Sequence, residues 1–501
     1  MRATSDGNRV QLLLDGNEYF GALHRLLDDV ERARDANRSY VKLAFWKANV
    51  AVVLGRSRTS LITKLQRVAN AGKRVRVILW QPDTVSGFAW SAHWHTSNEF
   101  LRQVGSVANA ETYFEKYLGW PFGRFLSATS QHQKIVIACV DGEKRALVGG
   151  LNMEPQYDDT ADHGGDYPIQ HLQGVPADEQ KHNWHDTGLA VEGPAAGDIE
   201  SEWDRRWAKS KRAPVRLTTV ARRGGNTRLT VATTNAESWT SREEHIRQKL
   251  VEEIGRANHF VYLESFVVFD PEIVKAIVAR LKQRQHLGVL IVVPRPDLQH
   301  PAGEAANDYL NFTTFAQLAY ASCRRINGTT ALGPRSERAI AASGSWNEST
   351  SATVNGRKLQ LASITAFEGG VRLYSAMRRT AAGAVPIYIH SKLAVIDDHV
   401  AVVGSANWNY RSMHYDGELS VFVHDDPAAV REIRRRVFAH FGMVRAATAT
   451  VGNVCREWQQ AAKDADDPRD VAPNEVFMRR LQLADFPQQL PGSRLDSWKN
   501  H

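Results

Sequence analysis

The chain has 501 residues, 43% of them hydrophobic, which is enough for two or more globular domains with sizeable cores. Its three cysteines are too few and too scattered for a disulfide framework or a zinc site, and this usage favours a reducing compartment. No stretch approaches eighteen apolar residues, which excludes a membrane-spanning helix, and the formal net charge of +8 favours a polyanionic partner, either anionic lipid or nucleic acid.

The first half of the chain begins with alternating strand and helix patterns. We predict a strand over 40–46, a helix over 61–71 and a strand over 74–80. An aromatic-rich stretch between Gln81 and Gln131, which includes Trp120, comes next. Its rings either pack a lid against the core or form a pocket for an apolar tail or an aromatic group, and interfacial anchoring is a third use.

A motif hairpin and a polar segment follow in the first half. The segment 153–183 groups several aspartates with His163. Such groups could hold a metal, but their spacing is not diagnostic, and we interpret the segment as a solvated loop. A strand that opens at Asp186 and a helix over 198–207 complete this half, and the basic, glycine-containing stretch 210–226 is the predicted linker.

The second half repeats the same order of elements, which indicates an internal repeat. We predict a strand over 260–266, a helix over 271–284, a strand over 287–294, a motif hairpin, a strand from Glu418 and a helix over 427–441. A long loop over 324–357 is inserted before the hairpin. Within the last helix, we expect Arg434, Arg435 and Arg436 to lie on a solvated face.

Strands that alternate with helices predict an α/β protein. We expect two pseudo-symmetric halves, 1–209 and 227–501, joined by the linker 210–226. Each half is predicted to be a mixed β-sheet flanked by helices, with the active site at the interface between the halves.

The second motif is an ordered string of six residue types at fixed spacing: His390, Lys392, Asp397, Gly404, Ser405 and Asn407. The apolar segment 389–397 suits a strand that is buried on both faces. Because strand side chains alternate, we expect His390 and Lys392 to emerge side by side. A turn at 397–399 then returns the chain to Asn407. An imidazole, an ammonium and a carboxamide therefore meet at one end of a hairpin.

The first motif is a partial copy that contains His132, Lys134 and Asn152. Cys139 occupies the position of the aspartate, the nearest carboxylate is Asp141, and the closing asparagine arrives three residues later than in the second motif. We expect a lengthened hairpin turn to keep the histidine, lysine and asparagine in place. A decayed, non-catalytic first site is the alternative.

Two imidazoles with two lysines and two carboxamides suit the cleavage of a phosphodiester. A neutral imidazole attacks phosphorus, while the departing alkoxide, a poor leaving group, needs a proton from a second acid. Lysine and asparagine donors hold the non-bridging oxygens. No metal and no other cofactor is required by this arrangement.

Asp186 and Glu418 are candidate partners of the histidines, because each opens an apolar strand downstream of its own motif. A carboxylate that accepts the Nδ1 proton fixes the tautomer and leaves Nε2 for phosphorus. A surface salt bridge is the alternative role for either carboxylate, and Asp416 competes for the role of Glu418.

The chain resembles the phospholipase D superfamily, from about Leu14 to about Trp458, in these motifs and in stretches such as 260–266. Its two-motif members include phospholipases D, cardiolipin and phosphatidylserine synthases, and some nucleases. The resemblance implies that one motif histidine becomes a phosphohistidine while the other protonates the leaving alcohol. It favours His132 as nucleophile and His390 as acid, although the intact motif around His390 argues the other way.

We also assign four residues to substrate binding: Ser405, Gly150, Trp120 and Trp408. The expected activity is that of a phospholipase D-type phosphodiesterase or phosphatidyltransferase acting on a phospholipid. The alternatives are a nucleic-acid phosphodiesterase, a tailoring enzyme for an unusual small phosphodiester, and a membrane- or nucleic-acid-binding protein with a decayed site.

We expect a monomer whose partner is a phospholipid or another phosphodiester, with nucleic acid as the second choice. The amino terminus lacks the apolar core of a signal peptide, which favours a cytoplasmic protein in peripheral contact with a membrane. Secretion stays open for a chain from which a leader has been removed.

Overall fold

The structure is a computed structural model. It describes residues 2–54, 58–82, 87–117, 129–164, 184–212, 224–237, 242–284, 286–295, 311, 314, 318, 351–354, 357–360, 370–380, 383–466 and 475–481. Trp120, most of the predicted linker 210–226 and most of the predicted loop 324–357 lie outside the described residues.

The chain divides into two compact units. The first comprises Met1–Lys249, His390–Ala406 and Arg411–Val437, and the second comprises Leu250–Ile389, Asn407–Tyr410 and Phe438–His501. Each unit contains β-strands and helices, which confirms the predicted α/β class with mixed sheets flanked by helices. The units do not coincide with the predicted halves, because strands from the second half pair with strands from the first.

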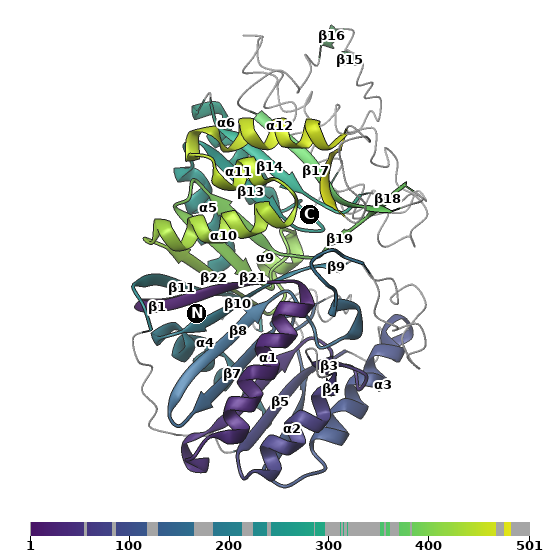
Figure 1. Cartoon of the computed structure of the whole chain (residues 1–501), viewed down its shortest axis with the longest axis vertical. Helices are drawn as coiled ribbons and strands as arrows, with labels where there is room; N and C mark the ends of the chain where they lie inside the picture. The colour runs from purple at the N-terminus through teal and green to yellow at the C-terminus, as the bar shows by residue number, and fades with distance from the viewer. Residues whose placement is uncertain are drawn as a thin grey trace. The chain divides into compact units, whose positions relative to one another are not determined.

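The first unit contains a long series of paired strands (Figure 1). In order of pairing they are β6 (Ala110–Lys116), β5 (Arg74–Gln81), β2 (Tyr40–Phe45), β7 (Ile135–Val140), β8 (Glu143–Gly149), β10 (Thr187–Glu192), β1 (Arg2–Leu14), β11 (Thr227–Asn235), β22 (Glu418–His424), β21 (Val400–Gly404) and β20 (Leu393–Ile396). The pairs β6–β5 and β5–β2 are parallel, and all the other pairs in this series are antiparallel.

Strand β1 joins the two motif regions within this unit. Its residues Arg9 to Leu14 pair with β10, while Arg2 to Asn8 pair with β11 across a bulge. Strand β11 in turn pairs with β22, which opens at Glu418. Asp186 directly precedes β10, and Glu418 is the first residue of β22. Strand β1, which pairs with β10 and with β11, therefore fixes how these two carboxylates are placed along the sheet. The sequence analysis did not predict this strand.

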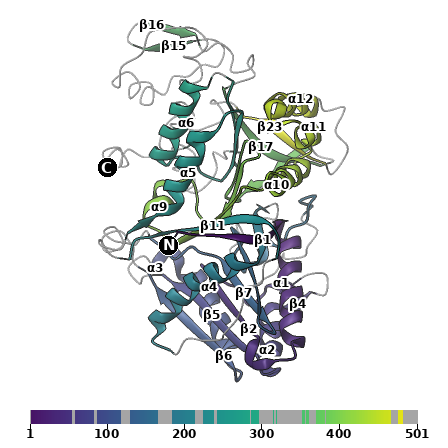
Figure 2. The same cartoon turned by 90° about the vertical axis from the view of Figure 1, so that its left-hand side faces the viewer.

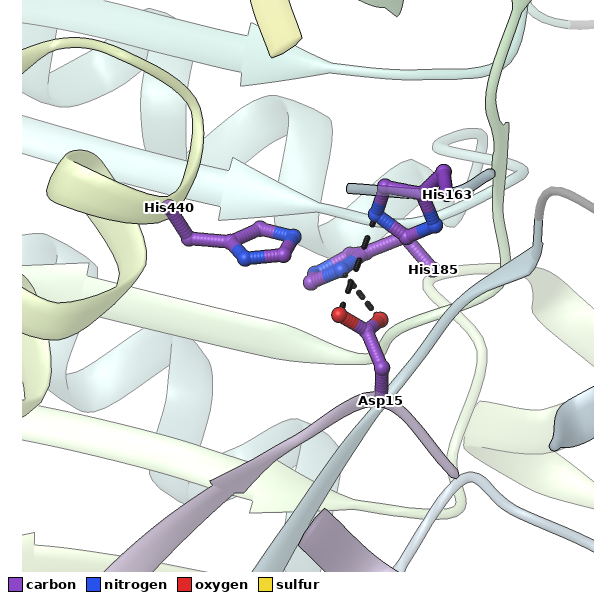
Figure 3. A group of neighbouring side chains, drawn as sticks. All are labelled: Asp15, His163, His185 and His440. Carbon is purple, nitrogen blue, oxygen red and sulfur yellow. Dashed lines mark ion pairs between the residues drawn. The ribbon is translucent and has the colours of Figure 1, made fainter. Parts of the chain in front are cut away.

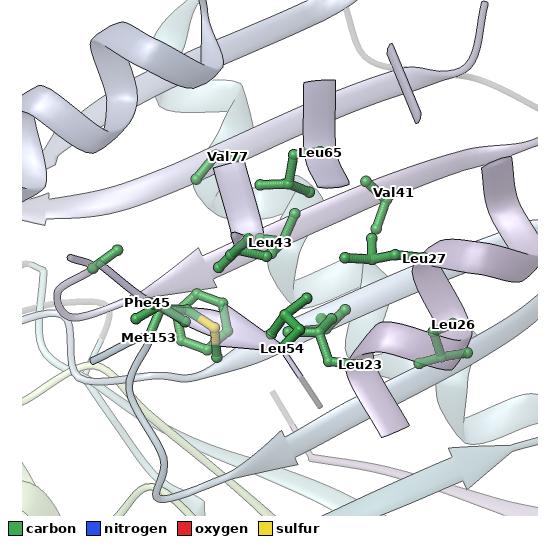
Figure 4. Packing of buried hydrophobic residues seen from close by; sticks show 14 of the residues in the cluster. Leu23, Leu26, Leu27, Val41, Leu43, Phe45, Leu54, Leu65, Val77 and Met153 are labelled. Atoms are coloured by element: carbon green, nitrogen blue, oxygen red, sulfur yellow. The ribbon is translucent and has the colours of Figure 1, made fainter. Parts of the chain in front are cut away.

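Helices cover both faces of the sheet in the first unit, as Figure 2 shows for α1 and α4. Within the described residues, four long helices lie wholly in the first unit: α1 (Asp15–Arg32), α2 (Leu61–Asn70), α3 (Gly87–Val104) and α4 (Pro194–Trp207). Helix α1 buries apolar side chains at helical spacing, including Leu23, Leu27 and Val30, against strands β2, β5 and β7. Figure 4 shows Leu23, Leu26 and Leu27 of this helix beside Val41, Leu43 and Phe45 of β2.

The second unit has a smaller mixed sheet. Strands β13 (Phe260–Glu264), β14 (Gly288–Val292) and β17 (Gly370–Thr380) are parallel, while β18 (Gly383–Pro386) and β23 (Val476–Arg480) pair antiparallel with β17. Helices α6 (Pro271–Gln283) and α12 (Val454–Asp466) belong to this unit, and Asp270 caps α6 by accepting from two backbone N–H groups. The rings of Tyr262, Phe438 and Trp458 pack together, with centroids 4.7 to 5.4 Å apart.

The remaining elements are short or extend across a unit boundary. They are β3 (Val53–Leu54), β4 (Thr59–Ser60), β9 (Trp184–His185), β12 (Glu243–Glu244), β15 (Ser351–Val354), β16 (Arg357–Gln360), β19 (Tyr388–Ile389), α5 (His245–Arg256), α9 (Tyr410–His414), α10 (Pro427–His440) and α11 (Val444–Thr448), with 3-10 turns at Ala36–Arg38, Pro155–Tyr157, Ala208–Ser210 and Val451–Asn453. Within the described residues, none of the helices has the length and apolar character needed to cross a membrane.

Most predicted elements occur within two residues of their predicted ends. Helix α4 begins earlier than the predicted 198–207, because Pro194 suits the first helical turn, where no backbone N–H is needed. The solvated face expected for the arginines of α10 is wrong for Arg434, which is 1% exposed. Its guanidinium donates to both carboxylate oxygens of Asp398, at 2.6 and 2.9 Å, and so ties the helix to the second hairpin turn.

Candidate active site

Each motif places its histidine and lysine directly before the first strand of a hairpin. His132 and Lys134 precede β7, and His390 and Lys392 precede β20. The prediction that the second pair lies inside a strand is therefore wrong. The backbone at these positions bonds elsewhere: the His132 N–H donates to the Gly417 carbonyl and the His390 N–H to the His185 carbonyl, both at 2.8 Å.

The first hairpin is longer than the second, but the added residues lie in its strands rather than in its turn. Strands β7 and β8 have six and seven residues, whereas β20 and β21 have four and five. Val140 pairs with Glu143 around a two-residue turn, and Ile396 pairs with Val400 around a three-residue turn. The expected lengthened turn is thus wrong, although the polar ends of the two hairpins remain equivalent.

The two candidate carboxylates contact the histidines, but each contacts the histidine of the other motif. Asp186 Oδ2 lies 2.7 Å from His390 Nδ1, and Glu418 Oε1 lies 3.0 Å from His132 Nδ1. In the tautomer that donates from Nδ1 to the carboxylate, Nε2 carries the lone pair. This exchange brings both motifs to one place in the first unit.

Asp416 does not take the role of Glu418. Its Oδ1 accepts from the Ser130 N–H at 2.7 Å, and its Oδ2 contacts the Arg411 guanidinium at 2.7 Å. Burial raises the pKa of Asp416 to about 6 and that of Glu418 to about 7, against the opposing charges of Arg411 and Lys134 respectively.

The two lysines are buried beside the histidines. Lys134 Nζ donates to the His132 carbonyl oxygen at 2.8 Å, and Lys392 Nζ lies 2.8 Å from His390 Nδ1. Both lysine residues are 1% exposed. Burial lowers the pKa of Lys392 to about 8, although the charges of Asp186 and Glu418 oppose this shift.

The four motif side chains form one electrostatic group. Burial lowers the pKa of His132 well below its usual value, and the charges of Lys134 and Lys392 lower it further. Burial and then Lys392 lower the pKa of His390 to about 3, with Lys134 adding to the shift and Asp186 opposing it. Both imidazoles are therefore neutral near pH 7 in the free protein. Burial also lowers the pKa of Lys134 well below its usual value, although the charge of Glu418 opposes this shift.

The chain is similar to known proteins over much of its length. Residues 250–440 match the family model described as "Cardiolipin synthase, PLD-like domain". Phospholipase D alpha 4 of Arabidopsis thaliana is 21% identical over 458 residues, which cover 77% of this chain and 58% of the relative. Cardiolipin synthase A of Pseudomonas putida is 24% identical over 421 residues, which cover 83% of this chain and 65% of the relative.

These similarities support a place for the chain in the phospholipase D superfamily. It spans less than two thirds of the length of these two curated relatives. Among solved structures, the phosphatidylserine synthase of Haemophilus influenzae Rd KW20 is 13% identical with a TM-score of 0.46, over 95% of this chain and 89% of that one.

Three of the residues assigned to substrate binding from the sequence make contacts inside the protein. The Ser405 hydroxyl donates to Glu418 Oε2 at 2.5 Å, and the Ser405 carbonyl oxygen lies 3.2 Å from His132 Nδ1. Gly150 makes room for Asp186, since a Cβ at that position would lie 2.1 Å from Asp186 Oδ1. Ser405 and Gly150 therefore hold the two carboxylates that contact the superfamily histidines.

Trp408, the third of these residues, is packed within the second unit. It is 1% exposed, and its indole N–H donates to the Glu264 carbonyl at 2.9 Å. Trp408 is therefore part of the packed interior of its unit, and its contact with substrate stays a prediction.

The motif asparagines keep hydrogen-bonding capacity for a ligand. Asn152 Nδ2 donates to the Tyr157 hydroxyl at 3.3 Å, while Asn152 Oδ1 is buried without a hydrogen-bond partner in the described part of the chain. The same holds for Oδ1 of Asn407, which belongs to the second unit. A buried carboxamide with an unsatisfied atom is costly unless a ligand completes it.

Aromatic rings flank both superfamily histidines, and the sequence analysis did not single them out. Trp46 meets the His132 ring edge-on at 5.7 Å and stacks on Trp80 at 5.9 Å. Trp184 and Tyr157 lie 5.2 and 5.4 Å from the His390 ring. Two sequence signals could have identified tryptophans here: Trp46 follows the carboxyl end of β2, where α/β sheets bind ligands, and Trp184 lies two residues before Asp186.

Proposed function

We propose that this protein is a phospholipase D-type phosphodiesterase that forms a phosphohistidine on His132 and acts on a phospholipid, transferring the phosphatidyl group to water or to an alcohol. One observation carries the proposal: two buried imidazoles, each with Nδ1 on a carboxylate from the other motif, share their surroundings with two lysines. The names of the relatives support phospholipid as the substrate class.

His132 suits the nucleophile, because its Nδ1 is engaged and its Nε2 has no hydrogen-bond partner in the described part of the chain. In the first step, Nε2 bonds to phosphorus, the bond from phosphorus to the leaving oxygen breaks, and His390 gives that oxygen a proton. In the second step, His390 takes a proton from water or an alcohol, whose oxygen replaces Nε2 on phosphorus.

The bound phosphodiester itself prepares the acid. In the free protein the charges of the lysines and burial hold the pKa of His390 at about 3, so its imidazole is neutral. A phosphodiester anion beside Lys134 and Lys392 offsets their charge and raises the pKa of His390 toward a value at which it can donate. The lysines therefore have two roles. They donate hydrogen bonds to the phosphate, and they keep the histidines neutral until substrate binds.

Two substrates with different leaving groups test these roles. We expect His132→Ala and His390→Ala each to lose turnover of phosphatidylcholine vesicles. With bis(p-nitrophenyl) phosphate, whose phenolate leaves without a proton, His390→Ala should release about one equivalent of phenolate per chain in a burst and then stall, because the second step still needs His390 as base, whereas His132→Ala should release none. His24→Ala, in helix α1 away from the motifs, is the matched control and should behave as wild type. Full activity of His132→Ala on either substrate would refute the proposal.

A nucleic-acid diester is the second candidate substrate, and the formal net charge of +8 favours it. The stacked rings of Trp46 and Trp80 could receive a base. Single-stranded DNA and a panel of small phosphodiesters should therefore be tested beside the vesicles. Cleavage of DNA by wild type with no reaction on vesicles would overturn the lipid assignment and keep the two-histidine mechanism.

A further inference from the structure

A second group of polar side chains lies beside Asp186 in the first unit. Asp15, His163 and His185 are 0 to 1% exposed, and Figure 3 shows their polar ends turned toward one another. Asp15 Oδ1 lies 2.8 Å from His185 Nδ1, and Asp15 Oδ2 lies 3.7 Å from His163 Nε2. His440, drawn in the same figure, belongs to the second unit and is not part of the group considered below.

The backbone brings these residues together by a close approach between α1 and the segment 153–164. Gly16 permits it, because a Cβ there would lie 1.7 Å from the Tyr157 carbonyl oxygen. The Asn17 N–H donates to the Asp159 carbonyl oxygen at 3.0 Å. The predicted solvated loop is therefore wrong for Asp159 and His163, which are 3% and 0% exposed.

The orientation of His163 is that of a metal ligand. His163 Nδ1 lies 2.9 Å from Asp159 Oδ2, so its Nε2 faces Asp15. A carboxylate on the far ring nitrogen is the usual outer partner of a metal-bound histidine, because it fixes the tautomer and the ring direction. Asp159 is therefore placed to orient the His163 ring with Nε2 directed at the metal.

The burial of this group suits a bound cation. Asp15 and Asp159 are 1% and 3% exposed, and buried carboxylates are stabilised by positive charge or by hydrogen bonds close by. A divalent cation bound by Asp15 would supply such charge.

We propose that Asp15, His163 and His185 bind one divalent transition-metal cation, with Zn²⁺ the best fit. One ligand atom from each residue lies within 4.8 Å of the others. Asp15 presents a different oxygen to each histidine, Oδ1 at 2.8 Å from His185 Nδ1 and Oδ2 at 3.7 Å from His163 Nε2, so a cation bound by this carboxylate would lie beside both imidazoles. Two imidazoles with one carboxylate disfavour Mg²⁺ and Ca²⁺, which prefer oxygen ligands.

The cation would brace the segment that carries the carboxylate of His390. The Asp15 N–H donates to the Asp186 carbonyl at 2.9 Å, and the Asp186 N–H donates to Asp15 Oδ1 at 3.3 Å. The His185 carbonyl oxygen also accepts a hydrogen bond from the His390 backbone N–H, at 2.8 Å. The metal therefore has a structural role and takes no part in phosphoryl transfer, so the proposal does not depend on the substrate or on the proposed reaction.

Metal binding by the full chain tests the proposal. After removal of metal with a chelator, Zn²⁺ titrated by calorimetry should bind at one equivalent per chain, and Co²⁺ should give the absorption of a tetrahedral site. Asp15→Asn and His163→Ala should bind no Zn²⁺ at this site, and Asp159→Asn should weaken binding by about 10–100-fold. Asp162→Asn, a matched control next to His163 with an exposed carboxylate, should bind as wild type.

A second measurement uses wild-type protein alone, so it holds even when a variant fails to fold. Chelation should lower the melting temperature, and Zn²⁺ should restore it, because a cation that binds only the folded state stabilises it. The proposal is overturned by either of two results. One is a melting temperature of the chelated protein that does not change when Zn²⁺ is added, and the other is equal Zn²⁺ affinity of wild type and Asp15→Asn. Neither readout uses phosphodiester turnover.

Discussion

The two motif hairpins are alike at one end and different at the other. In both, the motif glycine pairs with the residue two positions after the carboxylate: Gly149 pairs with Gly188, after Asp186, and Gly404 pairs with Ser420, after Glu418. At the far end, the first hairpin has longer strands and a shorter turn. The shared register shows that the polar end is held constant, whereas the turn end is free to vary.

Cys139 and Asp397 make the same point from the position at which the motifs diverge. Asp397 lies in the three-residue turn, whereas Cys139 lies inside β7, opposite Tyr40 of β2, with its thiol donating to the Arg38 carbonyl. The longer strands of the first hairpin therefore account for the missing aspartate at this position, because Cys139 lies in a strand where Asp397 lies in a turn.

The surroundings of the two histidines also differ. His132 Nδ1 has Glu418 and the Ser405 carbonyl, whereas His390 Nδ1 has Asp186 with Lys392 beside it. An ammonium at that nitrogen disfavours the protonated imidazole. This ammonium opposes the acid role of His390 in the free protein, so the proposed mechanism needs the substrate anion to offset the lysine charge. Four experiments test the comparison of the two motif hairpins.

The orienting carboxylates should have the largest effect. We expect Glu418→Gln and Asp186→Asn each to lower kcat by about 10²–10⁴-fold, because a carboxamide no longer selects the tautomer with Nε2 unprotonated. Steady-state kinetics on the preferred phosphodiester measures this loss. Glu192→Gln on β10 has its side chain in a surface ion pair with Arg9 and should retain activity. A loss below tenfold in both carboxylate variants would contradict the orienting role.

Displacement of one carboxylate without changing its charge should have a smaller effect. A Cβ in Gly150→Ala would meet Asp186 Oδ1 at 2.1 Å, so the carboxylate must move away from His390. We expect kcat to fall by about 10²-fold, the scale of a misplacement near 1 Å. Gly197→Ala, where a Cβ meets nothing within 4 Å, should leave kcat unchanged, and equal activity of the two variants would count against the geometry.

The pH dependence separates the two lysines. Because the protonated ammonium binds phosphate and the pKa of Lys392 is about 8, activity is lost as the pH rises through that value. Activity also falls as the pH drops below about 7, because the Glu418 carboxylate that orients His132 has a pKa of about 7 and becomes protonated. In the pH profile, we expect kcat/KM to fall about tenfold per pH unit on the alkaline limb, above the pKa of Lys392. In Lys392→Arg the guanidinium stays protonated, so the limb should move to higher pH. If the alkaline limb moves in Lys134→Arg and not in Lys392→Arg, the titrating group is the lysine of the first motif.

The smallest effects are on stability and concern the far end of the first hairpin. Insertion of the motif aspartate as Cys139→Asp buries a carboxylate in β7 and should cost roughly 3–5 kcal/mol of unfolding free energy. Cys139→Ser should cost roughly 1 kcal/mol, since a hydroxyl can donate to the Arg38 carbonyl as the thiol does. Urea unfolding measures both. A more stable Cys139→Asp variant would show that the first hairpin tolerates the second motif's pattern.

Sequence patterns determined the local elements, because apolar spacing depends on neighbouring residues. The strands β2, β5 and β14 and the helices α2 and α6 follow such spacing, and the residue types of the two motifs indicated histidine chemistry before any coordinates. Only the tertiary structure decided which carboxylate meets which histidine, that β1 joins the two motif regions, and that Asp159 and His163 are buried. These depend on strand pairing and on close approach at Gly16 and Gly150, between residues that are distant in sequence.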